Sequence, residues 1–178
     1  MPDEEAVVLT VGHSTHPLEE FVELLQSAGI GVVVDVRSLP GSNRHPQFNA
    51  ENLAENLPAQ GIAYRRVPDL GGRRNLQRAI EPEVNGFWQN RSFHNYADYA
   101  LSEDFEAGLA ELRTMADEAR PAIMCSEAVW WRCHRRIIAD HLLARGVDVR
   151  HLMPGGRVQP AELTRGAVVR GGTVEYPA

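Results

Sequence analysis

Residues 6–36, AVVLTVGHSTHPLEEFVELLQSAGIGVVVDV, decide the fold. The runs at 6–11 and 30–36 are short, apolar and rich in β-branched residues, which is typical of strands buried on both faces. Between them, apolar residues recur at helical spacing from Leu18 to Leu25, and Gly29 ends the helix. A strand, a helix and a second strand of these lengths form a βαβ unit, so the two strands are expected to be parallel.

The rest of the chain continues this alternation. Three further strands are predicted, at 62–68, 121–125 and 147–152. Helices are predicted after Asn49, at 93–101, at 103–119, and from the end of the 121–125 strand to Arg145. The segment AVVRGGTVEY predicts a C-terminal hairpin with a Gly-Gly turn. The sequence therefore predicts a single α/β domain over 1–178, with three layers (α/β/α), a mainly parallel sheet of about five strands and helices on both faces.

Composition narrows the class of protein. The chain has 178 residues and a formal net charge of −6, which argues against a general binder of nucleic-acid backbones. All 18 of its cationic side chains are arginine. The lack of lysine excludes Schiff-base catalysis and a lysine-dependent phosphate loop, so anions must be held by arginine, histidine or backbone N–H groups.

The sequence also indicates a compartment. No apolar run approaches the roughly 20 residues that span a bilayer, so we expect no membrane association. The acidic start, MPDEE, does not resemble a secretory signal. Two cysteines are too few for a disulfide framework, and a reducing cytoplasm is the expected location.

A long irregular excursion occupies residues 69–101 and is expected to be functional, as a lid over the strand ends. LGGRR, at 70–74, supplies flexible backbone and two arginines. Nearby aromatic residues either stack on a flat ligand or, as is more usual for Tyr96 and Tyr99 at helical spacing, belong to the core.

Chemically active side chains follow three of the predicted strands. In open parallel sheets, ligands bind beyond the carboxyl ends of the strands, so these side chains are expected at one common edge. We expect catalytic roles for His13, Asp35, Cys125 and Glu127, and ligand-binding roles for Ser14, Arg37, Ser38, Cys133, His134 and Arg135.

Two of these residues have specific physical arguments. The helical phase places Arg135 on the same apolar face as Trp131, and a buried guanidinium must meet an anion, which is Glu127, Asp35 or a bound ligand. Cys125 lies near arginines and the positive end of the predicted helix, conditions that favour a thiolate nucleophile, although a small buried apolar role is the alternative.

A metal site is the competing interpretation of the same side chains. Cys125, Cys133, His134 and His13 form a set of nitrogen and sulfur ligands, but none of the paired spacings of structural zinc sites is present. We therefore assign no metal ligands, and the sequence identifies no cofactor.

These motifs resemble the family called domain of unknown function 488 (DUF488). The similar segments are Gly12-His13-Ser14, Asp35-Val36-Arg37-Ser38, Pro46/Phe48/Asn49, Leu70-Gly71-Gly72, Tyr96/Tyr99 and Cys125/Glu127/Cys133/His134/Arg135. The resemblance implies a three-layer α/β domain with a functional pocket and does not imply a reaction. The VWW segment at 129–131 departs from the family pattern, in which polar residues are more usual.

The leading hypothesis is an enzyme, a hydrolase or group transferase, that binds a small anionic ligand, phosphorylated or nucleotide-like, at the carboxyl edge of the sheet. One alternative is a non-catalytic nucleotide or nucleic-acid binding module, with a surface formed by Arg65, Arg66, Arg73, Arg74 and Arg78. A second alternative is a metal-dependent hydrolase. The sequence does not indicate an oligomeric state.

Overall fold

The computed structural model describes residues 6–41 and 44–178 and has a six-stranded sheet at its centre, in the order β3-β2-β4-β1-β5-β6. The strands are β1 (Val7–Gly12), β2 (Val32–Asp35), β3 (Ala63–Arg66), β4 (Pro121–Cys125), β5 (Asp148–Leu152) and β6 (Val158–Pro160). All neighbouring pairs are parallel except β5 and β6, which are antiparallel. The acidic start, 1–5, and positions 42–43 lie outside the described residues.

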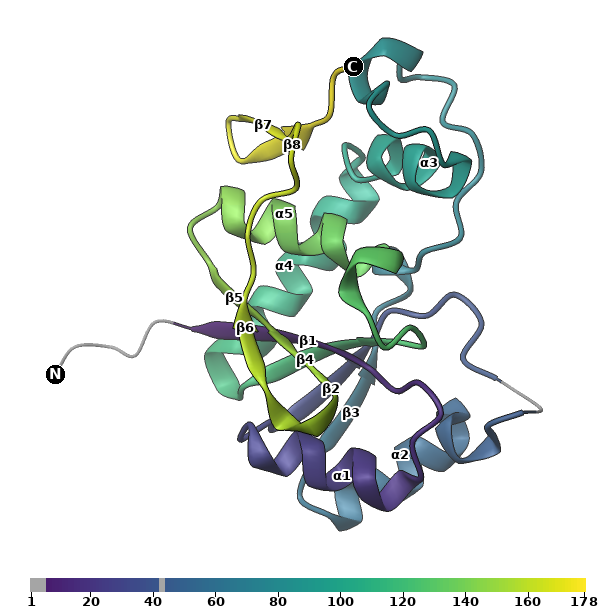
Figure 1. Cartoon of the computed structure of the whole chain (residues 1–178), viewed down its shortest axis with the longest axis vertical. Coiled ribbons are helices and arrows are strands. Elements are labelled where there is room, and N and C mark those ends of the chain that lie inside the picture. The colour runs from purple at the N-terminus through teal and green to yellow at the C-terminus, as the bar shows by residue number, and fades with distance from the viewer. Residues whose placement is uncertain (1–5, 42–43) are drawn as a thin grey trace, which may run out of the picture.

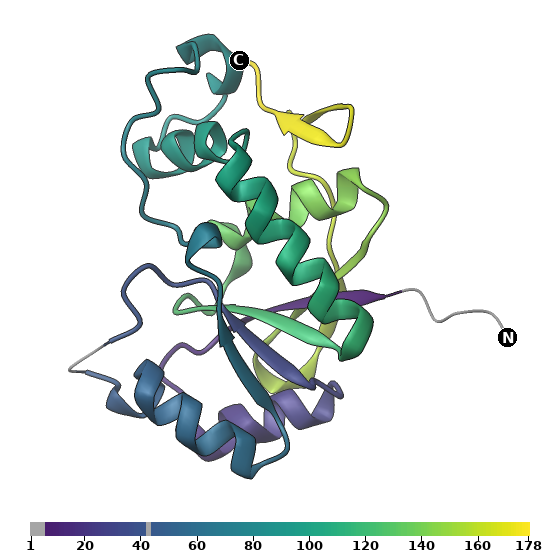
Figure 2. The same ribbon diagram turned by 180° about the vertical axis from the view of Figure 1, so that it is seen from behind.

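Helices cover both faces of this sheet, so the predicted three-layer fold is confirmed. α1 (Leu18–Ser27) and α2 (Ala50–Ala59) lie on one face, and α4 (Glu103–Glu118) and α5 (Arg135–Ala144) lie on the other (Figures 1 and 2). α3 (Arg91–Tyr99) and the hairpin β7 (Val168–Arg170) and β8 (Thr173–Glu175) lie beyond α4 and α5, away from the sheet (Figure 1). The C-terminal hairpin is thus also confirmed.

The apolar strand runs follow from this layering. Successive side chains of a strand point to opposite faces, and here each face is covered by helices. In β4, Ile123 belongs to the core under α4 and α5, whereas Met124 belongs to the core under α1 and α2. Both side chains are fully buried, which explains why this strand is apolar throughout rather than alternating.

The structure adds two details of topology to the predicted fold. β1 and β2 are parallel, as expected for the βαβ unit, but β4 lies between them and pairs with both. In addition, β6 extends the sheet beyond the five predicted strands, because residues after the η5 turn (Pro154–Gly156) fold back along β5. In the part of the chain that the structure describes, no helix has both the length and the apolar character needed to cross a membrane.

The prediction that a helix follows β4 directly is wrong. Residues 126–134 form a loop with a 3-10 turn at Trp130–Arg132, and α5 begins only at Arg135. In this loop the Trp130 ring stacks on the His151 ring, with centroids 4.6 Å apart, and Trp131 packs edge-on against Trp130. Trp131 is 45% exposed and does not lie on a buried helix face.

Candidate functional site: a cysteine-containing pocket at the sheet edge

The site lies where β1 and β4, adjacent and parallel, send their following segments to opposite faces of the sheet. The chain leaves β1 toward α1 on one face and leaves β4 toward α5 on the other (Figure 1). Such a reversal opens a crevice beyond the carboxyl ends of the two strands, the usual ligand position in open α/β sheets.

Backbone hydrogen bonds continue the β1–β4 pairing into this crevice. The N–H groups of His13 and Ser14 donate to the carbonyls of Cys125 and Ser126, at 2.9 and 3.0 Å. Gly12 is required for this approach, because a Cβ at that position would lie 1.6 Å from the Glu127 carbonyl oxygen. The two loops are therefore held in fixed register.

A cavity of about 650 Å³ opens beside these loops, and we call it the sheet-edge pocket. Seven of the ten predicted site residues line it: His13, Arg37, Ser38, Cys125, Glu127, Cys133 and His134. Asp35, Ser14 and Arg135 are not among its lining residues. The segments that follow three strands, distant in sequence, are thus brought to one hollow.

Asp35 lies behind the pocket and holds Arg37 in place. Its two carboxylate oxygens accept hydrogen bonds from Arg37 Nε at 2.9 Å and Nη2 at 2.7 Å, and the Tyr64 hydroxyl donates to one of them at 2.5 Å. The Asp35 side chain is fully buried, and that of Arg37 is 8% exposed. Asp35 therefore serves the site by orienting Arg37, whose Nη1 remains directed at His13.

His13 is a neutral hydrogen-bond acceptor in this arrangement. Nδ1 lies 2.8 Å from the Ser14 carbonyl, which only accepts, so Nδ1 carries the proton and Nε2 accepts from Arg37 Nη1 at 3.3 Å. Burial lowers the pKa of His13 to about 4, and the charge of Arg37 acts in the same direction. The ring also stacks on Phe48, with centroids 4.2 Å apart. Ser14 itself has a φ of 51°, a left-handed conformation that lets its carbonyl turn back to His13.

The anion that partners Arg135 is the sulfur of Cys125 rather than either carboxylate. Arg135 is fully buried, and its Nη1 lies 2.6 Å from Cys125 Sγ and 2.6 Å from the Glu127 carbonyl oxygen. Its Nε donates to the Thr10 hydroxyl at 3.2 Å. Arg135 therefore contacts the nucleophile candidate from behind the pocket wall, and no interaction with Glu127 or Asp35 carboxylates is formed.

Cys125 has the electrostatic surroundings of a reactive thiol. Burial by itself raises the pKa of a thiol, but a hydrogen bond from Cys133 and the charge of Arg135 outweigh it and lower the pKa of Cys125 to about 7. The pKa of Cys133 is raised well above its usual range by burial and by the neighbouring Cys125 sulfur. Of the two thiols, Cys125 is therefore the one that loses its proton more readily.

His134 completes this row of side chains. Its Nε2 lies 3.1 Å from the Val36 carbonyl and must donate to it, which leaves Nδ1 as an acceptor 3.6 Å from Cys133 Sγ. Burial lowers the pKa of His134 to about 4, so the ring stays neutral. His134 Nδ1 can thus accept the proton of the Cys133 thiol.

The excursion at 69–101 forms the far wall of the pocket, to which it contributes Gly72, Arg73, Asn90, Ser92 and Phe93. A Cβ at Gly72 would lie 2.4 Å from His134 Nδ1, so only glycine allows this approach. The Arg73 N–H donates to the Ser38 hydroxyl at 2.8 Å, which ties the excursion to the segment after β2. Tyr96 and Tyr99 are core residues, as the more usual interpretation expected, and their hydroxyls donate to the carbonyls of Leu70 and Asp69.

Three residues contribute to the site without having been predicted there: Arg73, Arg132 and Tyr64. Arg73 and Arg132 are exposed residues in the pocket wall, and their proximity to LGG and to Cys133 was the available signal. One of the five arginines proposed as a nucleic-acid surface, Arg74, is occupied by contacts within the protein. Its guanidinium lies over the Tyr99 ring at 3.8 Å and donates to the Gly71 and Pro68 carbonyls. Within 6–41 and 44–178, no three His, Cys, Asp or Glu side chains gather in a way that could hold a metal ion.

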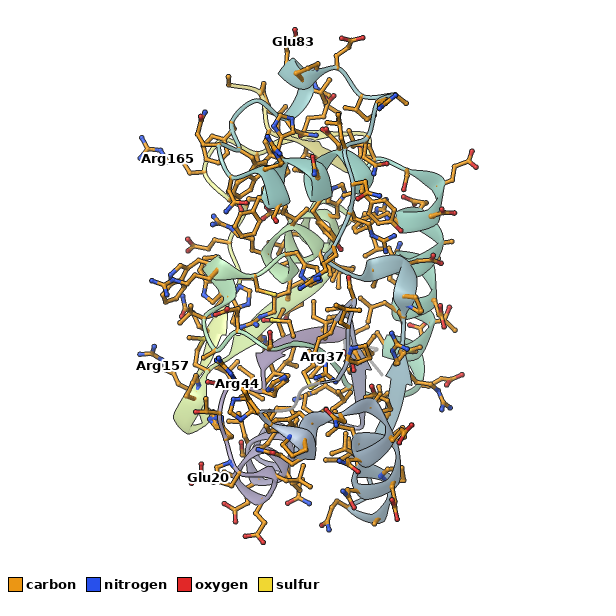
Figure 3. The ribbon with its side chains drawn as sticks, turned by 90° about the vertical axis from the view of Figure 1, so that its right-hand side faces the viewer. Glu20, Arg37, Arg44, Glu83, Arg157 and Arg165 are labelled. Atoms are coloured by element: carbon orange, nitrogen blue, oxygen red, sulfur yellow. The ribbon has the colours of Figure 1, made fainter. Side chains whose placement is uncertain are left out.

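Figure 3 shows where Arg37 lies relative to other charged groups. The Arg37 side chain lies within the outline of the molecule, whereas Arg157 and Arg165 project from its edge into solvent. The pocket therefore has a fixed, buried cation at its base and the exposed Arg73 and Arg132 in its wall.

Fold and site together define a class: a three-layer α/β protein with a thiol-containing pocket at the switch point of a parallel sheet. The chain belongs to the family described as domain of unknown function DUF488, whose model matches residues 17–142, more than two thirds of the sequence. No curated protein and no solved structure shows a significant match to the chain.

Proposed function

We propose that the protein is an enzyme that binds a small anionic ligand, phosphorylated or nucleotide-like, in the sheet-edge pocket and acts on it as a hydrolase or group transferase. The wall of the pocket carries this proposal. Arg37, Arg73 and Arg132 line a hollow that also contains Cys125, in a chain whose net charge is −6. Arginine forks match the geometry of phosphate and carboxylate groups, and a thiolate beside them is positioned to attack a bound electrophile.

Each side chain has a distinct role in this proposal. The Cys125 thiolate is the nucleophile, and Arg135 is a positioning residue that keeps the sulfur charged. Glu127, the one acidic side chain among the described lining residues, transfers the proton to or from the leaving group. His13 and Asp35 position Arg37, because both bind its guanidinium. Ser38 and His134 hold the excursion and the Cys133 thiol in the wall.

A thermal-shift screen of phosphorylated metabolites and nucleotides tests binding. A ligand at 100 times its dissociation constant stabilises a protein by about 2.7 kcal/mol, which corresponds to roughly 5–10 °C for a domain of this size. We expect Arg73→Ala/Arg132→Ala to lose this shift. The matched control Arg113→Ala/Arg157→Ala removes two exposed arginines outside the pocket and should retain it.

Catalysis is tested separately with the ligand found in that screen. We expect Cys125→Ser to bind the ligand but not convert it, because the hydroxyl is a much weaker nucleophile than the thiolate. Equal stabilisation of both double variants by every ligand would contradict the pocket assignment. Oligonucleotide binding that weakens steeply with salt, without turnover, would favour the binding-module alternative. Stoichiometric metal in protein purified without a metal-affinity tag would favour the metal-dependent hydrolase.

A further inference from the structure

The two cysteines of the chain come from different elements and meet in the sheet-edge pocket. Cys125 ends β4, and Cys133 lies in the loop just before α5. Both are free, only 3% and 5% exposed, and both line the cavity. One residue contacts both sulfurs: the Arg135 backbone N–H donates to Cys133 Sγ at 3.4 Å, and Arg135 Nη1 donates to Cys125 Sγ at 2.6 Å. Two thiols that share this neighbour and open to one cavity, but are shielded from bulk solvent, are accessible to small reagents only.

We propose that Cys125 and Cys133 form a reversible disulfide when a small hydroperoxide enters the pocket. The two thiols are not equivalent, and this difference assigns their order of reaction. The Arg135 guanidinium contacts Cys125 Sγ at 2.6 Å and favours its thiolate, whereas Cys133 Sγ has only the Arg135 backbone N–H at 3.4 Å and the neutral His134 ring at 3.6 Å. Cys125 is therefore the attacking sulfur and Cys133 the resolving thiol.

The reaction balances with the hydroperoxide as the only added reagent. The Cys125 thiolate attacks the terminal oxygen of ROOH, the O–O bond breaks, and the products are Cys125–SOH and RO⁻, which takes a proton from water to give ROH. Cys133 then attacks the Cys125 sulfur, its thiol proton leaves with the hydroxyl as water, and the S–S bond forms. Two thiols are oxidised and one peroxide is reduced.

The surroundings of the pair also predict that the disulfide is easily reduced. Oxidation removes the negative charge opposite Arg135, whose remaining acceptors are the neutral Thr10 hydroxyl and the carbonyls of Glu127 and Ala128. A fully buried guanidinium without an anion is costly, so the reduced form is favoured. Stabilisation of the reduced form is what makes a dithiol pair strongly oxidising.

The sequence permits a direct test on the unmodified protein. Trypsin cleaves after Arg132, between the two cysteines, and does not cleave at Arg120 because proline follows. After hydrogen peroxide treatment and alkylation of free thiols, we expect peptide 114–132 linked to peptide 133–135, loss of both free thiols and a monomer on a non-reducing gel. Reduced glutathione should separate the two peptides, and a linkage that resists it would contradict reversibility.

Two variants separate the roles of the sulfurs. In Cys133→Ser, Cys125 should stop at sulfenic acid, trapped by dimedone, or proceed to sulfinic acid. In Cys125→Ser, Cys133 should remain reduced. Cys125 sulfinic acid beside a free Cys133 in the parent protein, or two unreacted thiols, would overturn the proposal. The proposal does not rest on the anionic substrate, because this experiment contains no ligand, and its failure would leave the arginine test above unaffected.

Discussion

Two clusters of buried polar side chains hold this protein together, and they differ in what they face. The sheet-edge cluster consists of His13, Asp35, Arg37, Cys125 and Arg135, and three of its members line the pocket. The C-terminal cluster consists of Asn85, Asp98, Asp140, Thr164 and Tyr176, and none of its members lines that pocket. Both clusters are buried, so burial alone does not identify a functional site.

The C-terminal cluster pairs carboxylates with neutral donors. Asp140 accepts from the Thr164 N–H at 2.9 Å and from the Tyr176 hydroxyl at 2.7 Å, and burial raises its pKa. Asn85 donates to Asp98 and accepts from the Tyr176 N–H. These contacts fasten the C-terminal strand β8 and the residues after it to α5 and α3.

The sheet-edge cluster, by contrast, contains two arginines that each contact a reactive side chain, and those side chains, His13 and Cys125, line the pocket. Arg37 is fixed by Asp35 and presents Nη1 to His13, and Arg135 is fixed behind Cys125. Arg136 does donate to Thr164 in the C-terminal cluster, at 3.4 Å, but it contacts no reactive side chain there. A network in which buried carboxylates are satisfied in this way is structural. A network in which a cation favours the charged form of a nucleophile beside a cavity is the better candidate for a catalytic site.

The largest expected effect comes from Arg37→Met, which leaves the Asp35 carboxylate buried without its cation. We expect the free energy of unfolding to fall by about 3–5 kcal/mol, measured by chemical denaturation. The control Arg150→Met breaks a pair with Asp148 in which both side chains are partly exposed to solvent, and should change the free energy of unfolding far less. Adding Asp35→Asn to Arg37→Met should recover part of the loss, and an unchanged stability in Arg37→Met would contradict the pairing.

A smaller effect distinguishes the two clusters directly. Tyr176→Phe and Tyr96→Phe each remove the hydroxyl of a fully buried tyrosine, and each should lower the free energy of unfolding by about 1–3 kcal/mol because an acceptor loses its donor. Only Tyr96→Phe should also weaken ligand stabilisation in thermal-shift assays, since its hydroxyl holds the Leu70 carbonyl next to the pocket wall. Equal loss of binding in both variants would remove the distinction between the clusters.

The smallest effect is a shift in the titration of Cys125. Iodoacetamide reacts with the thiolate, so the alkylation rate of peptide 114–132 should rise with pH and reach half its maximum near pH 7. Cys133→Ala removes a hydrogen-bond donor and should move this midpoint upward by about one pH unit, or roughly 1.4 kcal/mol. Cys133→Ser keeps a donor and should move it little. A midpoint in the ordinary range of a free thiol in the parent protein would contradict the charged Cys125.

Much of the fold was predictable because its signals are local. The continuous apolar runs of β2 and β4 follow from burial on both faces, and the spacing of apolar residues in α1 follows from its single buried face. The start of α5 was not predictable in this way. Trp131 has helical spacing to the apolar residues of α5, but its ring packs edge-on against Trp130, whose ring stacks on His151.

Some of the residues that line the pocket could also be predicted from the sequence. Parallel strands carry the residues that follow them to one edge, so His13, Arg37 and Cys125 could be expected together. Arg73 and Arg132 had only a weak signal, their proximity to LGG and to Cys133, because exposed arginines look alike until the excursion is folded over the strand ends.

The succession of strands and helices along the chain could be predicted from the sequence, and so could the reactive residues that follow the strands. Both depend only on periodicity and on the order of residues in the chain. The partner of Arg135, by contrast, became clear only from the folded protein, in which the guanidinium contacts the Cys125 sulfur instead of a carboxylate. Arg135 lies 10 positions from Cys125 and 125 positions from Thr10, so these residues become neighbours only when the sheet is assembled. Once they are buried, the interaction between the guanidinium and the sulfur is strong, because the distance is short and the surroundings have low polarity.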